Sequence, residues 1–258
     1  AYAAVTTFTT EPAAQLAAAL AELTPGDLNR AFFVSGGSEA VETALKIAKQ
    51  VQAMRGFPRR YKIIARRDSY HGMTMGAMSL TEGRNETWFG PFQYGVYHAP
   101  HPNRYRSDFG VEGEQADLLA ANWVETEILA QGPETVAAVI VEPISCASGV
   151  HIPSPIYWQR LREITEKYGE LLIADEVIDG FGRTGTMFAC EHYGIVPDIM
   201  TIAKGFSSGY APIGAALLRG SIFEIFKEQN TTPLGHALPF GGHPVAAAAA
   251  LRNLQIFE

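Results

Sequence analysis

Short apolar runs alternate along the chain with longer stretches in which apolar residues recur every three or four positions. The short runs predict strands, and the longer stretches predict helices that bury one face. Strands are expected at residues 31–34, 61–65, 136–141, 171–174, 199–203 and 211–218, and helices at residues 38–51, 115–131, 155–168, 221–229 and 243–258. Residues 81–113 have little periodicity, so a long loop is expected there. This alternation predicts an α/β fold with a mostly parallel sheet and helices on both faces.

The composition is that of an ordinary globular protein. The chain has 258 residues, of which 47% are hydrophobic and 18% charged, enough for one large domain or two small ones. A net charge of −7 without any basic run argues against nucleic acid as a partner. No apolar stretch has membrane-spanning length and no signal peptide is visible, so we expect a cytoplasmic protein with no membrane partner. Cys146, Cys190 and the histidines lack metal-ligand spacing, so no metal site is expected.

Polar groups follow four of the predicted strands, each at the end where the strand finishes. Gly37 and Ser38 follow residues 31–34, Glu142 follows residues 136–141, Asp175 follows residues 171–174, and Lys204 follows residues 199–203. The carboxyl ends of parallel strands meet at one edge of the sheet, where open α/β sheets bind their ligands. These groups are therefore expected to converge on one site.

Lys204 has two interpretations. Its stem could pack while its ammonium reaches solvent, as in most lysines. Alternatively, partial removal from water would disfavour the charged form and leave the amine available as a nucleophile. The second interpretation gains weight only from the groups expected around it.

Gly37 and Ser38 stand where a strand passes into a helix. Free backbone N–H groups make such a junction an anion site, although a capped helix start would look similar. The segment lacks both the P-loop pattern and the G-x-G-x-x-G pattern. Asp175 ends an apolar strand, where an unpaired carboxylate is costly. It could cap a helix, pair with Arg183, or keep a heterocyclic nitrogen protonated.

Two further residues suit a flat ligand. Tyr70 precedes a glycine turn; it could simply pack, or it could stack on a planar ring. Val177 lies two residues after Asp175, so its side chain would point the same way and press on that ring. A phosphate anchor, a stacking aromatic, a ring-nitrogen carboxylate and an amine nucleophile together describe a pyridoxal phosphate site.

Several motifs carry a family resemblance over essentially the whole chain. They are Phe-Val-Ser-Gly-Gly-Ser-Glu-Ala at 33–40, Tyr-His-Gly-Met-Thr at 70–74, Val-Glu-Pro at 141–143, Asp-Glu-Val at 175–177, Gly-Phe-Gly-Arg-Thr-Gly at 180–185, Ala-Lys-Gly at 203–205, Ser-Ser-Gly at 207–209 and Gly-His-Pro at 242–244. In these the chain resembles the class III aminotransferases of the type I pyridoxal phosphate fold. The resemblance implies that residues 1–258 form the large cofactor-binding domain, with an about seven-stranded sheet, of a longer protein that acts as a homodimer. The N-terminal segment and the small C-terminal domain would lie outside this chain.

The resemblance also implies roles for single residues. Lys204 would form the aldimine with pyridoxal phosphate and then move a proton between substrate and cofactor. Asp175 would pair with the ring nitrogen, and Glu142 would support Asp175. Gly37 and Ser38 would hold the phosphate, and Tyr70 and Val177 would cover the two faces of the ring. An amine donor and a keto acid acceptor would react in turn, with ping-pong kinetics.

Three positions depart from parts of the family. Ala147 replaces a glutamate, and Ile178 replaces a glutamine, of the ornithine, acetylornithine and GABA aminotransferases. Both changes resemble the omega-transaminases, including amine:pyruvate and β-alanine:pyruvate aminotransferases, which use pyruvate. Pro239 stands where a threonine usually reaches the phosphate across the dimer, so weaker cofactor retention is expected.

Three other functions remain open at this point. An aminomutase or epimerase would use the same scaffold. The chain by itself could bind the cofactor without turnover. A nucleotide-binding oxidoreductase would leave Lys204 unexplained and lacks the acidic ribose partner at the expected spacing.

Overall fold

Seven strands form a single sheet in the computed structural model, which describes residues 8–81, 86–228 and 233–257. The strands lie in the order β1-β7-β6-β5-β4-β2-β3. Their bounds are β1 Arg30–Val34, β2 Lys62–Arg66, β3 Val96–Ala99, β4 Val136–Val141, β5 Leu171–Asp175, β6 Ile199–Ile202 and β7 Gly214–Leu218. Only β7 runs against its neighbours, β1 and β6, while the other adjacent pairs are parallel. The predicted mostly parallel sheet is confirmed.

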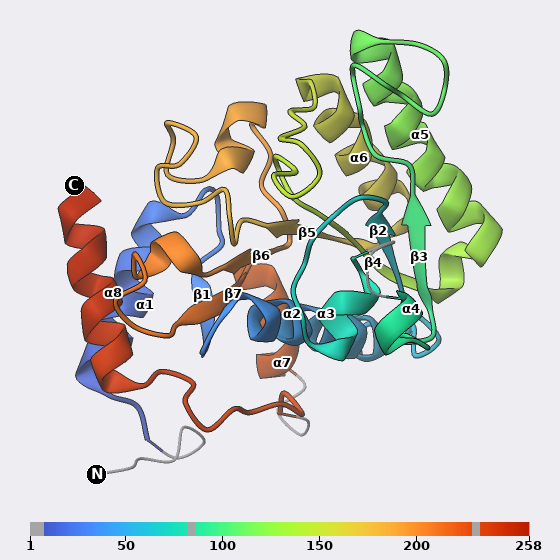
Figure 1. Cartoon of the computed structure of the whole chain (residues 1–258). Coiled ribbons are helices and arrows are strands. Elements are labelled where there is room, and N and C mark those ends of the chain that lie inside the picture. The colour runs from blue at the N-terminus through green and yellow to red at the C-terminus, as the bar shows by residue number, and fades with distance from the viewer. Residues whose placement is uncertain (1–7, 82–85, 229–232, 258) are drawn as a thin grey trace.

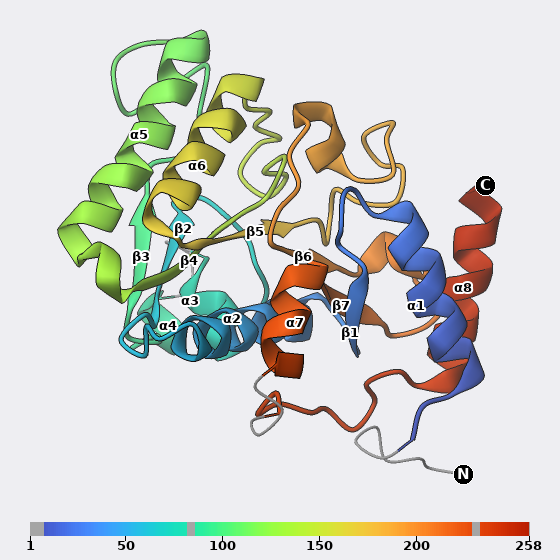
Figure 2. The same cartoon turned by 180° about the vertical axis from the view of Figure 1, so that it is seen from behind.

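Helices cover both faces of this sheet. Their bounds are α1 Glu11–Leu23, α2 Gly37–Met54, α3 Met75–Ser79, α4 Glu86–Phe89, α5 Gly113–Gln131, α6 Pro155–Tyr168, α7 Gly220–Glu228 and α8 Pro244–Phe257. Helices α2 and α7 lie on one face. On the other face, α5 and α6 cover the half near β3, and α1 and α8 lie side by side over the half near β1 (Figure 1, Figure 2). This arrangement confirms the predicted layers.

Strand β4 shows why the apolar runs fold in this way. All six of its residues are buried. Ala138 and Ile140 face the cluster under α2, whereas Val139 and Val141 face the cluster under α5 and α6. A fully buried valine or isoleucine side chain contributes about 1.5–3 kcal/mol. A strand buried on both faces therefore appears in the sequence as a continuous apolar run.

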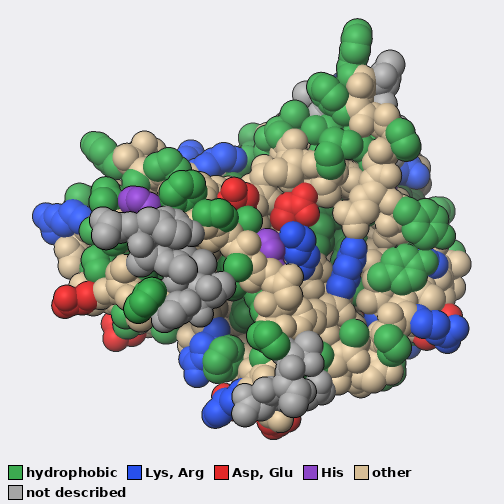
Figure 3. Space-filling view, turned by 90° about the horizontal axis from the view of Figure 1, so that it is seen from below, with side chains coloured by type: hydrophobic (Ala, Val, Ile, Leu, Met, Phe, Trp, Pro, Cys, Tyr) green, Lys and Arg blue, Asp and Glu red, His purple; other side chains and the backbone are tan. Residues whose placement is uncertain are grey.

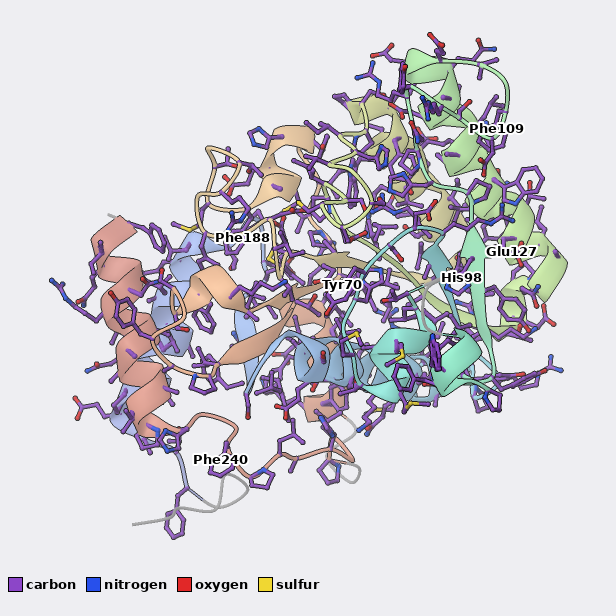
Figure 4. The ribbon with its side chains drawn as sticks, in the orientation of Figure 1. Tyr70, His98, Phe109, Glu127, Phe188 and Phe240 are labelled. Atoms are coloured by element: carbon purple, nitrogen blue, oxygen red, sulfur yellow. The ribbon has the colours of Figure 1, made fainter. Side chains whose placement is uncertain are left out.

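The prediction of a long loop at residues 81–113 is wrong for the part of that segment that the structure describes. That segment contains α4, the edge strand β3, and the first residue of α5. Strand β3 has only four residues, and Tyr97 and His98 occupy its middle, so it has no apolar run to reveal it. His98 lies on this strand, at the edge of the sheet (Figure 4). The parallel pairing of β3 with β2 supplies the hydrogen bonds that sequence periodicity does not show.

Within the described residues, no helix is both long enough and apolar enough to cross a membrane.

Candidate active site

The carboxyl ends of β1, β4, β5 and β6 meet at one edge of the sheet, where they surround a cavity. All seven residues predicted for the site line this cavity, namely Gly37, Ser38, Tyr70, Glu142, Asp175, Val177 and Lys204. Tyr70 lies near the middle of the molecule, between the sheet and α3 (Figure 4). The strand-end argument therefore identified the residues that the fold brings together.

Asp175 is held by three donors at the end of β5. Its Oδ2 lies 2.7 Å from Nδ1 of His71, and its Oδ1 accepts hydrogen bonds from the Thr201 hydroxyl at 2.8 Å and the Val177 N–H at 3.2 Å. The side chain of Arg183 instead donates to the carbonyl of Ile178 at 2.8 Å. Arg183 is thus not the partner of Asp175, and the carboxylate is fixed in a buried position that faces the cavity.

Lys204 begins a short 3₁₀ turn, Lys204–Phe206, directly after β6. Its φ of +48° lies in the left-handed region, which costs a non-glycine residue about 1–3 kcal/mol and is concentrated at functional sites. Its Nζ lies 5.9 Å from the centroid of the Tyr70 ring. The side chain as a whole is exposed, yet partial desolvation lowers the pKa of Lys204, and the Asp175 carboxylate opposes that effect. The net lowering favours the neutral, nucleophilic amine.

The start of α2 provides a cradle without side chains. A Cβ on Gly37 would lie 2.7 Å from Cγ1 of Val177, so only glycine fits. The first N–H groups of this 18-residue helix have no partner within the helix, which suits an anion. The Ser38 hydroxyl accepts a hydrogen bond from the Met73 N–H at 3.0 Å and keeps its own hydrogen to donate. A phosphate fits this set of donors.

Glu142 supports Tyr70. Its Oε1 accepts a hydrogen bond from the Tyr70 N–H at 3.2 Å, and its Oε2 pairs with Nη2 of Arg66 at 3.1 Å. In the described part of the chain no hydrogen bond joins Glu142 to Asp175. The observed contacts of Glu142 are thus with Tyr70 and Arg66, and its support of Asp175 stays a prediction.

Sequence reasoning missed the residues that position Asp175. His71 had a signal, because it adjoins Tyr70 in a motif already singled out. Thr201 had none, because its place opposite Asp175 follows from the register of β5 and β6. Asp179 also lines the cavity and was not predicted. No group of three His, Cys, Asp or Glu side chains suited to a metal ion occurs among the residues that the structure describes.

Pro239 lies away from this cavity. It lines a second one of about 750 Å³, together with residues of β1 and the segment before α8, such as Phe33 and His243. Pro239 therefore has no direct contact with the candidate phosphate position in the same chain.

The residues present fit pyridoxal phosphate. The N–H groups at Gly37 and the hydroxyl of Ser38 suit its phosphate, and the fixed carboxylate of Asp175 suits a protonated ring nitrogen. Tyr70 and Val177 offer an aromatic and an apolar surface in the same cavity, and Lys204 offers an amine.

Comparison with known proteins identifies the family of this chain. The sequence model of the family described as Aminotransferase class-III matches residues 2–258. The chain therefore belongs to the class-III aminotransferases, and the resemblance carried by its motifs is confirmed.

Three similar proteins illustrate the match. A Mycobacterium tuberculosis protein named as a probable aminotransferase is 46% identical over 252 residues, which cover 97% of this chain and 54% of that protein. The putrescine–pyruvate aminotransferase of Pseudomonas aeruginosa is 41% identical over 248 residues, with 96% and 54% coverage. A crystal structure of an (S)-enantioselective omega-transaminase from Thermomicrobium roseum has a TM-score of 0.93 and 43% identity, covering 100% of this chain and 57% of that one. The chain spans about half the length of the curated relatives it matches.

Proposed function

We propose that the whole protein transfers an amino group from an omega-amino acid or primary amine to a keto acid such as pyruvate, with pyridoxal phosphate held in this cavity. The observation that carries the proposal is the convergence of Lys204, Asp175 and the first turn of α2 on one cavity. Family membership supports the same reaction class. Donor and acceptor bind in turn, which gives ping-pong kinetics.

Each residue of the cavity has a task in this reaction. When bound, pyridoxal phosphate supplies an electron sink for the charge left when the donor loses a proton. Lys204 Nζ accepts that proton and returns it, acting as general base and then general acid. Asp175 accepts a hydrogen bond from a protonated ring nitrogen, and His71 and Thr201 fix its orientation. Gly37 and Ser38 bind the phosphate through N–H and hydroxyl groups.

Two apolar residues stand at or near this cavity where parts of the family have polar ones. Ile178 lines the cavity, and Ala147 lies on the segment after β4 that also carries Ile144. Neither side chain can form an ion pair with an arginine or bind a carboxylate of the donor. This favours donors without an α-carboxylate. The names of the two relatives above, a putrescine–pyruvate aminotransferase and an omega-transaminase, support that choice.

A donor and acceptor screen tests this function. The whole protein is mixed with β-alanine, 1-phenylethylamine, putrescine, ornithine or γ-aminobutyrate, each with pyruvate or 2-oxoglutarate. We expect alanine to form from pyruvate in a one-to-one ratio with donor consumed. Exclusive use of ornithine or γ-aminobutyrate with 2-oxoglutarate would refute the donor assignment. Conversion of an amino acid without any keto acid would instead indicate an aminomutase or epimerase.

We also propose that the whole protein forms a homodimer. Apolar side chains are spread over several parts of the face seen from below, around charged groups of both signs (Figure 3). Met73 and Met75, which follow the Tyr70 turn, are 50% and 53% exposed, and Phe240 is 59% exposed. Exposed methionine and aromatic side chains of this kind are enriched at protein interfaces. Light scattering is expected to give twice the monomer mass, and a monomer mass at micromolar concentration would contradict the proposal.

A further inference from the structure

Asp179 is a buried carboxyl group without a cationic partner. It is 1% exposed, lies four residues after the end of β5, and lines the cavity that contains Lys204. Among the described residues no lysine, arginine or histidine forms an ion pair with it. Acidic residues are rarely buried in this way without a compensating charge. The functions assigned so far to the site leave this group unused.

The position of the Asp179 carboxyl is fixed by the segment after β4. Its Oδ2 accepts a hydrogen bond from the Ile144 N–H at 2.8 Å, and its Oδ1 lies 3.4 Å from Sγ of Cys146. Both partners come from the segment that forms one wall of the cavity. The carboxyl is therefore held between that wall and the segment after β5.

The turn that carries Lys204 packs directly on the segment that carries Asp179. A Cβ on Gly205 would lie 3.1 Å from Cβ of Phe181 and 3.3 Å from the carbonyl oxygen of Gly180. The residues that follow Asp179 and Lys204 are thus in contact. This contact places the carboxyl and the amine on adjoining turns around one cavity, where water is partly excluded and charges interact more strongly.

Several other charged or titratable groups act on the pair. Asp179 is influenced by Glu142 and Asp175, and it in turn influences Cys146, Glu176 and Tyr193. Lys204 is influenced by Asp175, Arg183, Cys146 and Asp179. Arg183 is exposed, and its positive charge opposes the carboxylates. Asp175 is the carboxylate with the larger effect on Lys204, and Asp179 adds a smaller one. Unlike Glu142 and Asp175, Asp179 has no basic side chain as a partner among the described residues.

We propose that Asp179 is a positioning residue that acts through Lys204: its negative charge, added to that of Asp175, helps to hold a proton on Nζ and so shifts the pH at which the free amine becomes available. This deepens the proposed function, because the same amine is its base. Burial raises the pKa of Asp179 to about 6, so the group is ionised at neutral pH. Its charge then works against the desolvation that lowers the pKa of Lys204.

Competitive labelling of lysines tests this without the cofactor. The whole protein, freed of bound cofactor, reacts with trace acetic anhydride over a range of pH, and the labelling of each lysine is measured by peptide mass spectrometry. In Asp179→Asn the labelling midpoint of Lys204 is expected to fall by at least about half a pH unit, a fraction of the shift of about one to three units that an adjacent opposite charge produces. Lys49, on α2 outside the cavity lining, is the internal control and keeps its midpoint.

A matched variant separates charge from loop anchoring. Glu176 is also buried and also accepts backbone hydrogen bonds, from Ala189 at 3.0 Å and Cys190 at 2.8 Å, but it does not line the cavity. Glu176→Gln is expected to leave the Lys204 midpoint unchanged. An unchanged midpoint in Asp179→Asn, or an equal shift in Glu176→Gln, overturns the proposal.

If the variant does not fold, the pH dependence of Lys204 labelling in the unsubstituted protein provides a second test. Protonation of Asp179 near pH 6 is expected to bend the Lys204 labelling curve there, and a curve with a single titration overturns the proposal. Because no amino transfer is measured, failure of this inference and failure of the proposed function remain distinguishable.

Discussion

Replacing Lys204 by alanine is expected to reduce amino transfer by the whole protein by about 10⁴-fold or more, the scale seen when an enzyme loses a nucleophile. Among the described residues, Lys204 is the lysine that lines the cavity; its Nζ lies 5.9 Å from the centroid of the Tyr70 ring, and Asp175 lines the same cavity. No neighbouring side chain in the lining has the same combination of nucleophile and mobile base. Steady-state rates of alanine formation from pyruvate measure the loss.

Lys49→Ala is the matched control. Burial lowers the pKa of Lys49 as it does that of Lys204, but Lys49 lies on α2 and does not line the cavity. The control variant is expected to keep its activity. Equal losses in the two variants would show that the position of Lys204 in the cavity has no special role, and retained activity in Lys204→Ala would remove it from the mechanism.

Asp175→Asn is expected to lower kcat/KM by about 10²- to 10⁴-fold, the range for a group that controls a proton in the transition state. Asparagine has nearly the same shape and still accepts a hydrogen bond from Thr201, but it has no charge to hold a proton on a ring nitrogen. The loss should therefore appear mainly in kcat. Kinetics with saturating pyridoxal phosphate separate this loss from weaker cofactor binding.

The neighbouring carboxylate provides the control for Asp175. Glu176→Gln removes a buried carboxyl next in sequence that faces away from the cavity toward Ala189 and Cys190. It is expected to keep kcat within a few-fold, because Glu176 does not line the cavity. A kcat for Asp175→Asn no lower than that of Glu176→Gln would contradict the role given to Asp175.

The sequence predicts where these side chains gather because buried strands and their ends leave strong signals. The six apolar residues of β4 form an uninterrupted run, and Glu142 follows at once. Asp175 likewise ends the apolar run of β5, and Lys204 comes two residues after β6, whose run includes Thr201. Since parallel strands end at one edge, the convergence of these side chains follows from the order of elements alone.

Other parts of the site depend on contacts that no periodicity records. The register of β5 and β6 places Thr201 beside Asp175, and a hydrogen bond from the Ile144 N–H holds the Asp179 carboxyl at the cavity. The reversed direction of β7 is set by its pairing with β1 and β6. The short edge strand β3 has Tyr97 and His98 in its middle, so it has no apolar run. Its hydrogen bonds to β2 hold it in the sheet.

Covalent mapping of the cofactor tests the central claim most directly. The whole protein is loaded with pyridoxal phosphate, reduced with borohydride, digested, and examined by peptide mass spectrometry. The account predicts one stoichiometric pyridoxyl group, on Lys204. A group on another lysine, or no stable attachment in protein that still transfers amino groups, would contradict it.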